Sequence, residues 1–235
     1  MDRTRLLMLG GAIAAAVVVV AVVIAVAGGG SKSARTTTTA TTPSTGGPEA
    51  VSTFAGVPQR DDTLGRASAP VTLTVFEDPQ CPYCREWNID TLPTVVQNYV
   101  RTGRIKIVYR GIVVIGPNSV DGLRAVYAAG LQNKLWNLSE ALYERQGDEN
   151  SGWITLRTIR DAAREVGVSY SRLIKDANTK AVTAKLRQAA NQAGAYGVNG
   201  TPTFAIQKPL GAFRQLQVSG LEPGVFTAAL DAALR

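Results

Sequence analysis

The sequence predicts a mixed fold, α/β (α+β), with a strand–helix–strand unit, an inserted block of helices, and a closing part of strands and one helix. Residues 71–76 and 105–110 alternate apolar and polar side chains and flank a helical pattern. Helical spacing then continues over about residues 117–195. Strand patterns return at residues 203–207 and 216–219. We therefore expect one mixed sheet to which both ends of this region contribute.

The N-terminal segment, residues 1–27, predicts a transmembrane anchor. Residues 6–27 carry no charged or polar side chain, and about 20 apolar residues suffice to span a bilayer as one helix. A cleaved signal sequence is the alternative, because basic residues precede the apolar run and residues 25–27 resemble a small-x-small cleavage site. We expect the uncleaved anchor, since the apolar run exceeds the usual signal-peptide core.

Residues 28–50 predict a flexible linker. They are rich in Thr, Gly, Ser and Pro and contain almost nothing to bury. Such a chain has a root-mean-square reach of roughly 25–30 Å. The linker would therefore hold the folded region, residues 51–235, close to the membrane surface.

The first unit of the folded region is a predicted βαβ unit. Its first strand, residues 71–76, is rich in β-branched side chains and lies between two prolines. Residues 82–100 then place apolar side chains near helical spacing, with Pro93 predicting a kink or a break. The second strand, residues 105–110, should lie parallel to the first through a right-handed crossover.

Helices dominate the remainder. Asn118 or Ser119 can cap the first inserted helix, and Pro223 suits the first turn of the last helix of the chain. The predicted helices of the insertion are residues 118–131, a stretch around residues 135–142, residues 155–166, residues 169–176 and a helix that begins after Asn178.

The composition excludes several kinds of site. The 235 residues include no histidine, so Ser-His-Asp and Cys-His catalysis and histidine zinc sites are excluded. Two cysteines are too few for a disulfide scaffold or for a four-thiolate zinc or iron–sulfur site. The net charge of +7 comes from interspersed charges without a basic run, so we expect no nucleic-acid partner.

The two cysteines form a C-x-x-C motif, Cys81-Pro82-Tyr83-Cys84, between the first strand and the helix. This spacing beside a βαβ pattern is typical of a redox-active dithiol. The helix N-terminus favours a thiolate on Cys81, which makes Cys81 the predicted nucleophile and Cys84 the resolving cysteine. Pro82 suits the first helical turn, where its missing N–H has no intrahelical partner. An inert structural disulfide and a two-thiolate copper site are the alternatives.

Three runs of sequence resemble the DsbA-like thiol:disulfide oxidoreductases. They are Ala69–Thr72, Phe76–Cys84 and Gly197–Phe204. The resemblance extends over about residues 54–235. It implies a thioredoxin fold, in which βαβ and ββα halves share a mixed sheet and a helical domain is inserted between them.

The resemblance also implies roles for individual residues. Thr201–Pro202 would be a cis peptide that faces the cysteines and pairs with an extended substrate. Many DsbA proteins have His where this chain has Tyr83, so Tyr83 and Pro82 would tune the redox properties. Some relatives place a buried carboxylate at the position of Val75, and Glu77 is the nearest substitute for its role in proton transfer.

We therefore expect a membrane-tethered, extracytoplasmic oxidoreductase that introduces disulfides into secreted or cell-envelope proteins. Substrate thiolates would attack Cys81 of the oxidised motif. Neither a bound cofactor nor a metal is needed, and a monomer is expected. The resemblance implies reoxidation by a quinone-linked membrane protein of the DsbB or vitamin K epoxide reductase type. Disulfide formation belongs to oxidising compartments, so the catalytic domain should lie outside the cell membrane.

Two other functions stay open at this point. The same fold could act as a disulfide reductase or isomerase, although residues 28–50 cannot supply the dimerisation domain that isomerases of this family usually carry. A different class of protein would be a non-catalytic module that binds Cu(I) through both thiolates or binds polypeptides near Thr201–Pro202.

Overall fold

The computed structural model describes residues 53–235. The predicted anchor at residues 1–27 and the predicted linker at residues 28–50 lie outside the described residues. Across residues 53–235, no helix combines the length and the apolar character that crossing a membrane requires.

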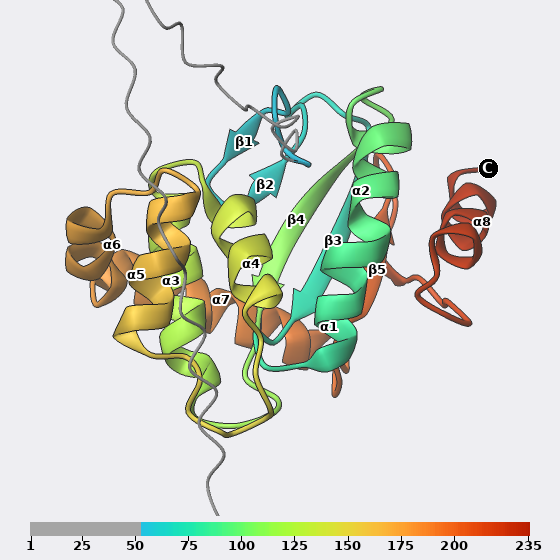
Figure 1. Cartoon of the computed structure of the whole chain (residues 1–235). Helices are drawn as coiled ribbons and strands as arrows, with labels where there is room; N and C mark the ends of the chain where they lie inside the picture. The colour runs from blue at the N-terminus through green and yellow to red at the C-terminus, as the bar shows by residue number, and fades with distance from the viewer. Residues whose placement is uncertain (1–52) are drawn as a thin grey trace, which may run out of the picture. The chain divides into compact units, whose positions relative to one another are not determined.

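A six-stranded mixed sheet forms the centre of the fold (Figure 1), in the order β1-β2-β4-β3-β5-β6. Only β3 and β4 run parallel; the other neighbours are antiparallel. The strands are β1 (Gln59–Arg60), β2 (Thr63–Leu64), β3 (Val71–Glu77), β4 (Ile105–Gly111), β5 (Thr203–Gln207) and β6 (Arg214–Gln215).

The parallel pair β3–β4 confirms the predicted βαβ unit. Its register runs from Val71 opposite Ile105 to Glu77 opposite Gly111. β3 is buried along nearly its whole length, because it is central in the sheet and helices cover both faces, whereas β4 alternates buried and half-buried residues. The C-x-x-C motif therefore follows directly from the carboxyl end of the most buried strand.

The helix that follows β3 is continuous through Pro93. It consists of α1 (Pro82–Glu86), a π-helical segment (Trp87–Thr91), α2 (Leu92–Val95) and a second π-helical segment (Val96–Val100). The irregularity predicted at Pro93 thus takes the form of wider turns on either side rather than a break. Proline removes one backbone donor, and π-helical turns accommodate such a mismatch within a helix.

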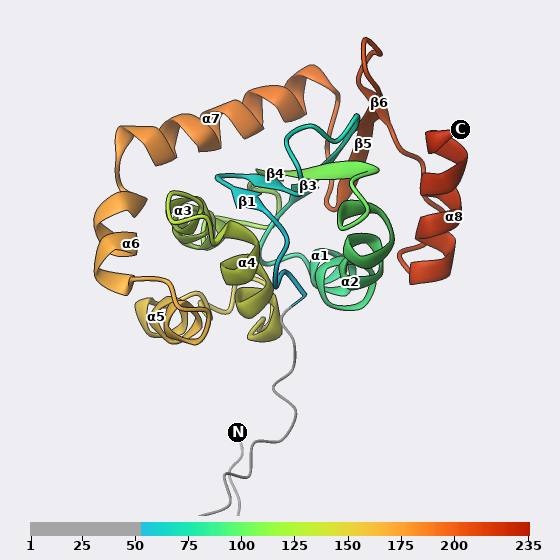
Figure 2. The ribbon, with the colours of Figure 1, turned by 90° about the horizontal axis from the view of Figure 1, so that it is seen from above.

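The inserted helices lie between β4 and β5 in the chain. Figure 2 shows α7 across one face of the sheet, the α1–α2 helix and α4 on the other, and α3, α5 and α6 beside the sheet. Thr155 and Thr179 cap α5 and α7, because each side chain accepts a hydrogen bond from the backbone N–H three residues later. The helices are α3 (Ser119–Gly130), α4 (Leu135–Glu144), α5 (Leu156–Glu165), α6 (Tyr170–Ala177) and α7 (Lys180–Ala195).

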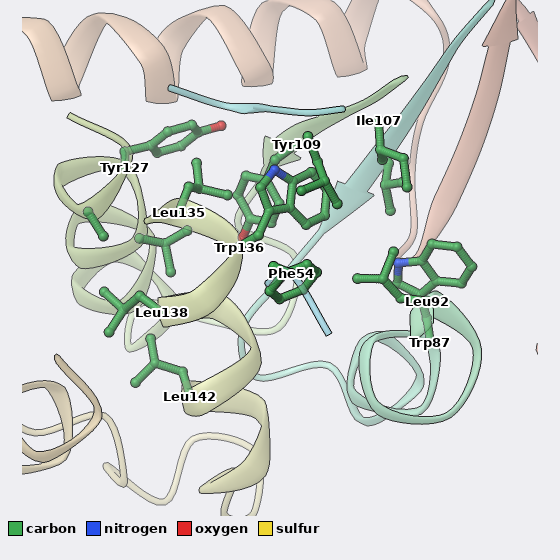
Figure 3. Close-up of a cluster of buried hydrophobic side chains, with 14 of the residues drawn as sticks. Phe54, Trp87, Leu92, Ile107, Tyr109, Tyr127, Leu135, Trp136, Leu138 and Leu142 are labelled. Carbon is green, nitrogen blue, oxygen red and sulfur yellow. The ribbon is translucent and has the colours of Figure 1, made fainter. Parts of the chain in front are cut away.

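One hydrophobic core joins the sheet to the inserted helices (Figure 3). Trp136 of α4 packs edge-on against Tyr109 of β4, with ring centroids 5.9 Å apart. On the same face of the sheet, Trp87 lies within 5 Å of both Phe204 of β5 and Phe226 of α8 (Pro223–Leu234). These aromatic contacts fix the insertion and the C-terminal helix to the strands that carry the motif.

Two short features differ from the sequence prediction. The prediction of a strand at residues 216–219 is wrong, since β6 lies at residues 214–215. It pairs with β5 over two residues only. The segment is irregular, and its apolar alternation arises because Leu216 and Val218 pack on the hydrophobic core. The β1–β2 hairpin was not predicted, because strands of two residues are too short to show a periodic pattern.

Candidate active site

The C-x-x-C motif lies where β3 ends and α1 begins. Cys81 has an extended backbone conformation at the helix N-cap, and Pro82 occupies the first turn. Both cysteines are free thiols and both are buried, with Cys81 3% exposed and Cys84 fully buried. The structure therefore shows the dithiol form, in which only Cys81 retains any access to solvent.

Thr201 and Pro202 lie against the outer cysteine. The peptide bond between them is cis, as the resemblance implied. The Cys81 thiol donates a hydrogen bond to the Thr201 carbonyl oxygen, with 3.2 Å between sulfur and oxygen. The fold thus brings together two segments that are 120 residues apart in the chain.

The two thiols differ in acidity because their surroundings differ. A hydrogen bond from the Cys84 thiol is the largest influence that lowers the pKa of Cys81, to about 6, and backbone hydrogen bonds from residues 83 and 84 act in the same direction. Burial raises the pKa of the Cys84 thiol well above its ordinary value. Near neutral pH, Cys81 is therefore a thiolate while Cys84 keeps its proton, which is what the predicted roles require.

Glu77, the last residue of β3, is fully buried behind the dithiol. Asn88 Nδ2 donates to one carboxylate oxygen at 3.1 Å and the Tyr143 hydroxyl donates to the other at 3.2 Å. Burial raises the pKa of Glu77 to about 8, against the lowering effect of these two hydrogen bonds. The structure thus places a carboxyl that gains and loses a proton near neutral pH beside Cys84, whose own pKa Glu77 raises further.

Pro82 and Tyr83 lie on the surface between the cysteines. Both are exposed, and Tyr83 is 63% exposed. The Tyr83 backbone N–H donates a hydrogen bond that lowers the pKa of Cys81. Any influence of the Tyr83 ring on the redox reaction therefore acts from the solvent side.

Asp78, which the sequence analysis did not single out, organises the segment around the motif. Its buried carboxylate accepts hydrogen bonds from Gln80 N at 2.9 Å, Val114 N at 2.7 Å, Ile115 N at 2.9 Å and the Ser119 hydroxyl at 2.6 Å. A carboxylate directly after a buried strand was the signal that could have identified it. Asp78 joins the start of the motif to the chain that enters α3.

The end of α4 makes a second connection to the motif. Gln146 Nε2 donates to the carbonyl oxygens of Pro79 at 2.9 Å and Cys81 at 3.0 Å. In return, Arg85 Nε donates to the Tyr143 carbonyl oxygen at 3.1 Å. The sequence gives no signal for these contacts, because they depend on how the inserted helices pack.

The geometry defines a class of protein. A nucleophilic thiolate at a helix N-terminus, a buried protonated partner three residues later and a backbone acceptor opposite them are suited to dithiol–disulfide exchange. Within residues 53–235, no group of three or more His, Cys, Asp or Glu side chains is arranged to hold a metal ion. The fold and the site are those of a thioredoxin-fold dithiol oxidoreductase.

Comparisons with known proteins agree with this class. A family model described as thioredoxin matches residues 59–210. The probable disulfide bond formation protein D of Bacillus anthracis is 27% identical over 149 residues, which cover 61% of this chain and 68% of that protein.

Two solved structures share the architecture. Oxidised BdbD from Bacillus subtilis matches with a TM-score of 0.64 at 19% identity, covering 76% of this chain and 97% of that one. A thioredoxin-like oxidoreductase from Silicibacter pomeroyi matches with a TM-score of 0.57 at 29% identity, covering 75% of this chain and 91% of that one.

The family model spans more than half of the chain, which therefore belongs to the thioredoxin family. Within that family, the chain is a DsbA-like thiol:disulfide oxidoreductase.

Proposed function

We propose that the protein is a membrane-tethered, extracytoplasmic oxidase that introduces disulfides into secreted or cell-envelope proteins. The observation that carries this proposal is the contrast between the two thiols, with the pKa of Cys81 lowered to about 6 and that of Cys84 raised. A stabilised Cys81 thiolate stabilises the reduced protein, and a stabilised reduced form makes the disulfide form a stronger oxidant. The name of the Bacillus anthracis relative refers to the same reaction.

The exchange proceeds in two steps. A substrate thiolate attacks the Cys81 sulfur of the oxidised protein, the Cys81–Cys84 bond breaks, and Cys84 leaves with the electron pair and takes up a proton. A second substrate thiolate then attacks the substrate sulfur of the mixed disulfide, and Cys81 leaves as a thiolate. Two electrons pass to the protein, and the substrate leaves with one new disulfide.

Glu77 is the proposed proton donor to Cys84. The leaving thiolate would be fully buried, where an unpaired charge is costly, so a proton source close by favours cleavage of the Cys81–Cys84 bond. Glu77 is buried in the same place and keeps its proton up to a pH of about 8.

Thr201 and Pro202 are the proposed substrate contact. The Thr201 carbonyl oxygen is already positioned 3.2 Å from the Cys81 sulfur. A substrate cysteine that reaches Cys81 would bring its own backbone against this segment. Pro82 and Tyr83, which are exposed and lie between the two cysteines in the chain, are proposed to adjust the redox properties of the site.

The proposed location and partners rest on the sequence. An apolar segment at residues 6–27 and a polar linker at residues 28–50 would hold the catalytic domain within reach of membrane proteins. A quinone-linked reoxidase of the DsbB or vitamin K epoxide reductase type is the proposed electron acceptor for a monomer of this protein. Confinement near the membrane raises the rate of that encounter.

The test is the reduction potential of the Cys81–Cys84 pair, measured on the full chain equilibrated with glutathione buffers. We expect a value close to about −120 mV, which marks a strong oxidant of this fold. A value near about −270 mV, typical of thioredoxin, would contradict the oxidase direction and favour a reductase.

A further inference from the structure

Tyr143 is a buried tyrosine from the inserted helices that reaches the redox site. It lies in the last turn of α4 and is 1% exposed. Its side chain packs in one small cluster with Cys81 and Cys84, which lie about 60 residues earlier in the chain. No step of the exchange as described above uses it.

The Tyr143 hydroxyl has one proton and two acceptors within reach. The oxygen lies 3.2 Å from Glu77 Oε2 and 3.2 Å from the carbonyl oxygen of Asp78. A phenol can donate to only one of these at a time, while its oxygen can also accept. The arrangement therefore permits two hydrogen-bonding states with almost the same atomic positions.

The two states match the two protonation states of Glu77. When Glu77 is ionised, the Tyr143 hydroxyl donates to Oε2 while Asn88 donates to Oε1, so both carboxylate oxygens are paired. When Glu77 carries a proton on Oε2, that proton is donated to the Tyr143 oxygen and the Tyr143 hydroxyl turns to the Asp78 carbonyl. In both states the two Glu77 carboxyl oxygens and the Tyr143 hydroxyl keep a hydrogen-bond partner.

We propose that Tyr143 is a positioning residue for proton transfer, whose hydroxyl alternates between Glu77 and the Asp78 carbonyl as Glu77 releases and regains its proton. The inference rests on the role of Glu77 in the proposed function. The proton leaves Glu77 for the Cys84 sulfur when the Cys81–Cys84 bond breaks, and Tyr143 then stabilises the carboxylate that remains. Tyr143 itself is neither oxidised nor deprotonated.

The other titratable groups around Glu77 do not replace this function. Three of these groups interact with Glu77 through their charges: Cys81 and Cys84 at the start of α1, and Tyr109 from β4. The Tyr109 hydroxyl makes no hydrogen bond among the described residues. A neighbour without a hydrogen bond cannot compensate the carboxylate in the way that a donor at 3.2 Å can.

The test is a pH titration of Glu77 in the reduced full-length protein, followed by the infrared C=O stretch of its carboxylic acid form. Glu77→Gln identifies the band by removing it. In Tyr143→Phe the ionised form loses a donor, so we expect the midpoint to rise by about one pH unit or more. Tyr127→Phe is the matched control, because Tyr127 is another buried tyrosine of the insertion and its hydroxyl pairs with Gly111 N instead.

A midpoint in Tyr143→Phe equal to that of the unmodified protein would overturn the inference. If Tyr143→Phe does not fold, a fluorotyrosine at position 143 serves instead. Its more acidic hydroxyl donates a stronger hydrogen bond, so the midpoint should fall, and an unchanged midpoint would again contradict the inference.

A failure of the proposed function can be told apart from a failure of the inference about Tyr143. A thioredoxin-like potential would reverse the direction of electron flow and leave the Tyr143 result intact. A normal exchange rate and pH profile in Glu77→Gln would remove the proton-donor role of Glu77, and the inference about Tyr143 would fall with it.

Discussion

The sulfur of Cys81 lies 3.2 Å from the carbonyl oxygen of Thr201, so the nucleophile and the segment before Pro202 share one site. This contact is made by a thiol that is only 3% exposed. In the proposed function, a substrate would approach along the Thr201 segment to reach the sulfur.

The unequal burial of the cysteines predicts unequal effects of replacing them. Cys81→Ser should abolish exchange, because the accessible nucleophile is lost. Cys84→Ser should accumulate mixed disulfides with substrates, since no resolving thiol remains. Non-reducing gel electrophoresis after incubation with a disulfide-bonded substrate distinguishes the two, because a Cys81 thiolate attacks the substrate disulfide and one substrate thiolate leaves. Identical behaviour of both variants, without trapped species, would contradict the assigned roles.

The thiolate of Cys81 should titrate near pH 6. Thiolate absorbance or the rate of alkylation, measured against pH, gives the midpoint. Cys84→Ala should move this midpoint upward, because the hydrogen bond from the Cys84 thiol is the largest influence that lowers the pKa of Cys81. Cys81→Ser is the control and should show no transition in this range. A midpoint close to that of an ordinary cysteine in the unmodified protein would refute the prediction.

Glu77 should make the reduced protein less stable as the pH rises. Its pKa in the folded protein is raised from 4.5 to about 8, so the folded form holds a proton that the unfolded chain releases above pH 4.5. The contribution of Glu77 to stability is complete below that pH and is lost as the pH rises toward 8.

The measurement compares Glu77→Gln with the unmodified protein by urea unfolding at several pH values. The difference in free energy of unfolding should change in favour of the variant by up to about 1.4 kcal/mol per pH unit between pH 4.5 and 8. Taking the difference cancels the contribution of Glu140, whose pKa is also raised. A difference that does not vary with pH would show that Glu77 ionises normally.

Asp78→Asn should destabilise the fold. The carboxylate accepts four hydrogen bonds, and an amide would turn an NH₂ group toward some of these donors. Loss of buried, charge-assisted hydrogen bonds predicts a cost of about 3 kcal/mol in the free energy of unfolding. Ser119→Ala removes one donor to Asp78 and the acceptor of Gln80 Nε2, and should cost about 1.5 kcal/mol. Equal costs for the two variants, measured by urea unfolding, would argue against the central role of Asp78.

The sequence was most informative where the signal was local. The strands at residues 71–76 and 105–110 and the C-x-x-C motif were predicted from periodicity and spacing, because burial on a sheet and the helix N-terminus act over a few residues. The cis bond at Thr201–Pro202 was implied by the resemblance alone, since most X-Pro bonds are trans.

Most contacts that the sequence did not predict join the inserted helices to the segment around the C-x-x-C motif. Tyr143 and Gln146 read as an ordinary helical tyrosine and a loop glutamine, and their roles depend on the packing of α4. The role of Asn88 could have been predicted from its position one helical turn after Cys84. It donates to the Cys84 carbonyl oxygen as well as to Glu77. A polar residue on a buried helix face was the missed signal.

The hydrogen bonds from the end of α4 also set conditions for exchanging parts between relatives. A chimaera that received a foreign helical insertion could keep every strand, the C-x-x-C motif and Thr201–Pro202, yet lack the donors that Tyr143 and Gln146 supply. Such a hybrid would be expected to fold around an altered redox centre. The inserted helices therefore supply hydrogen bonds on which the geometry of the redox site depends. Grafting experiments should transfer them together with the segment from Glu77 to Asn88.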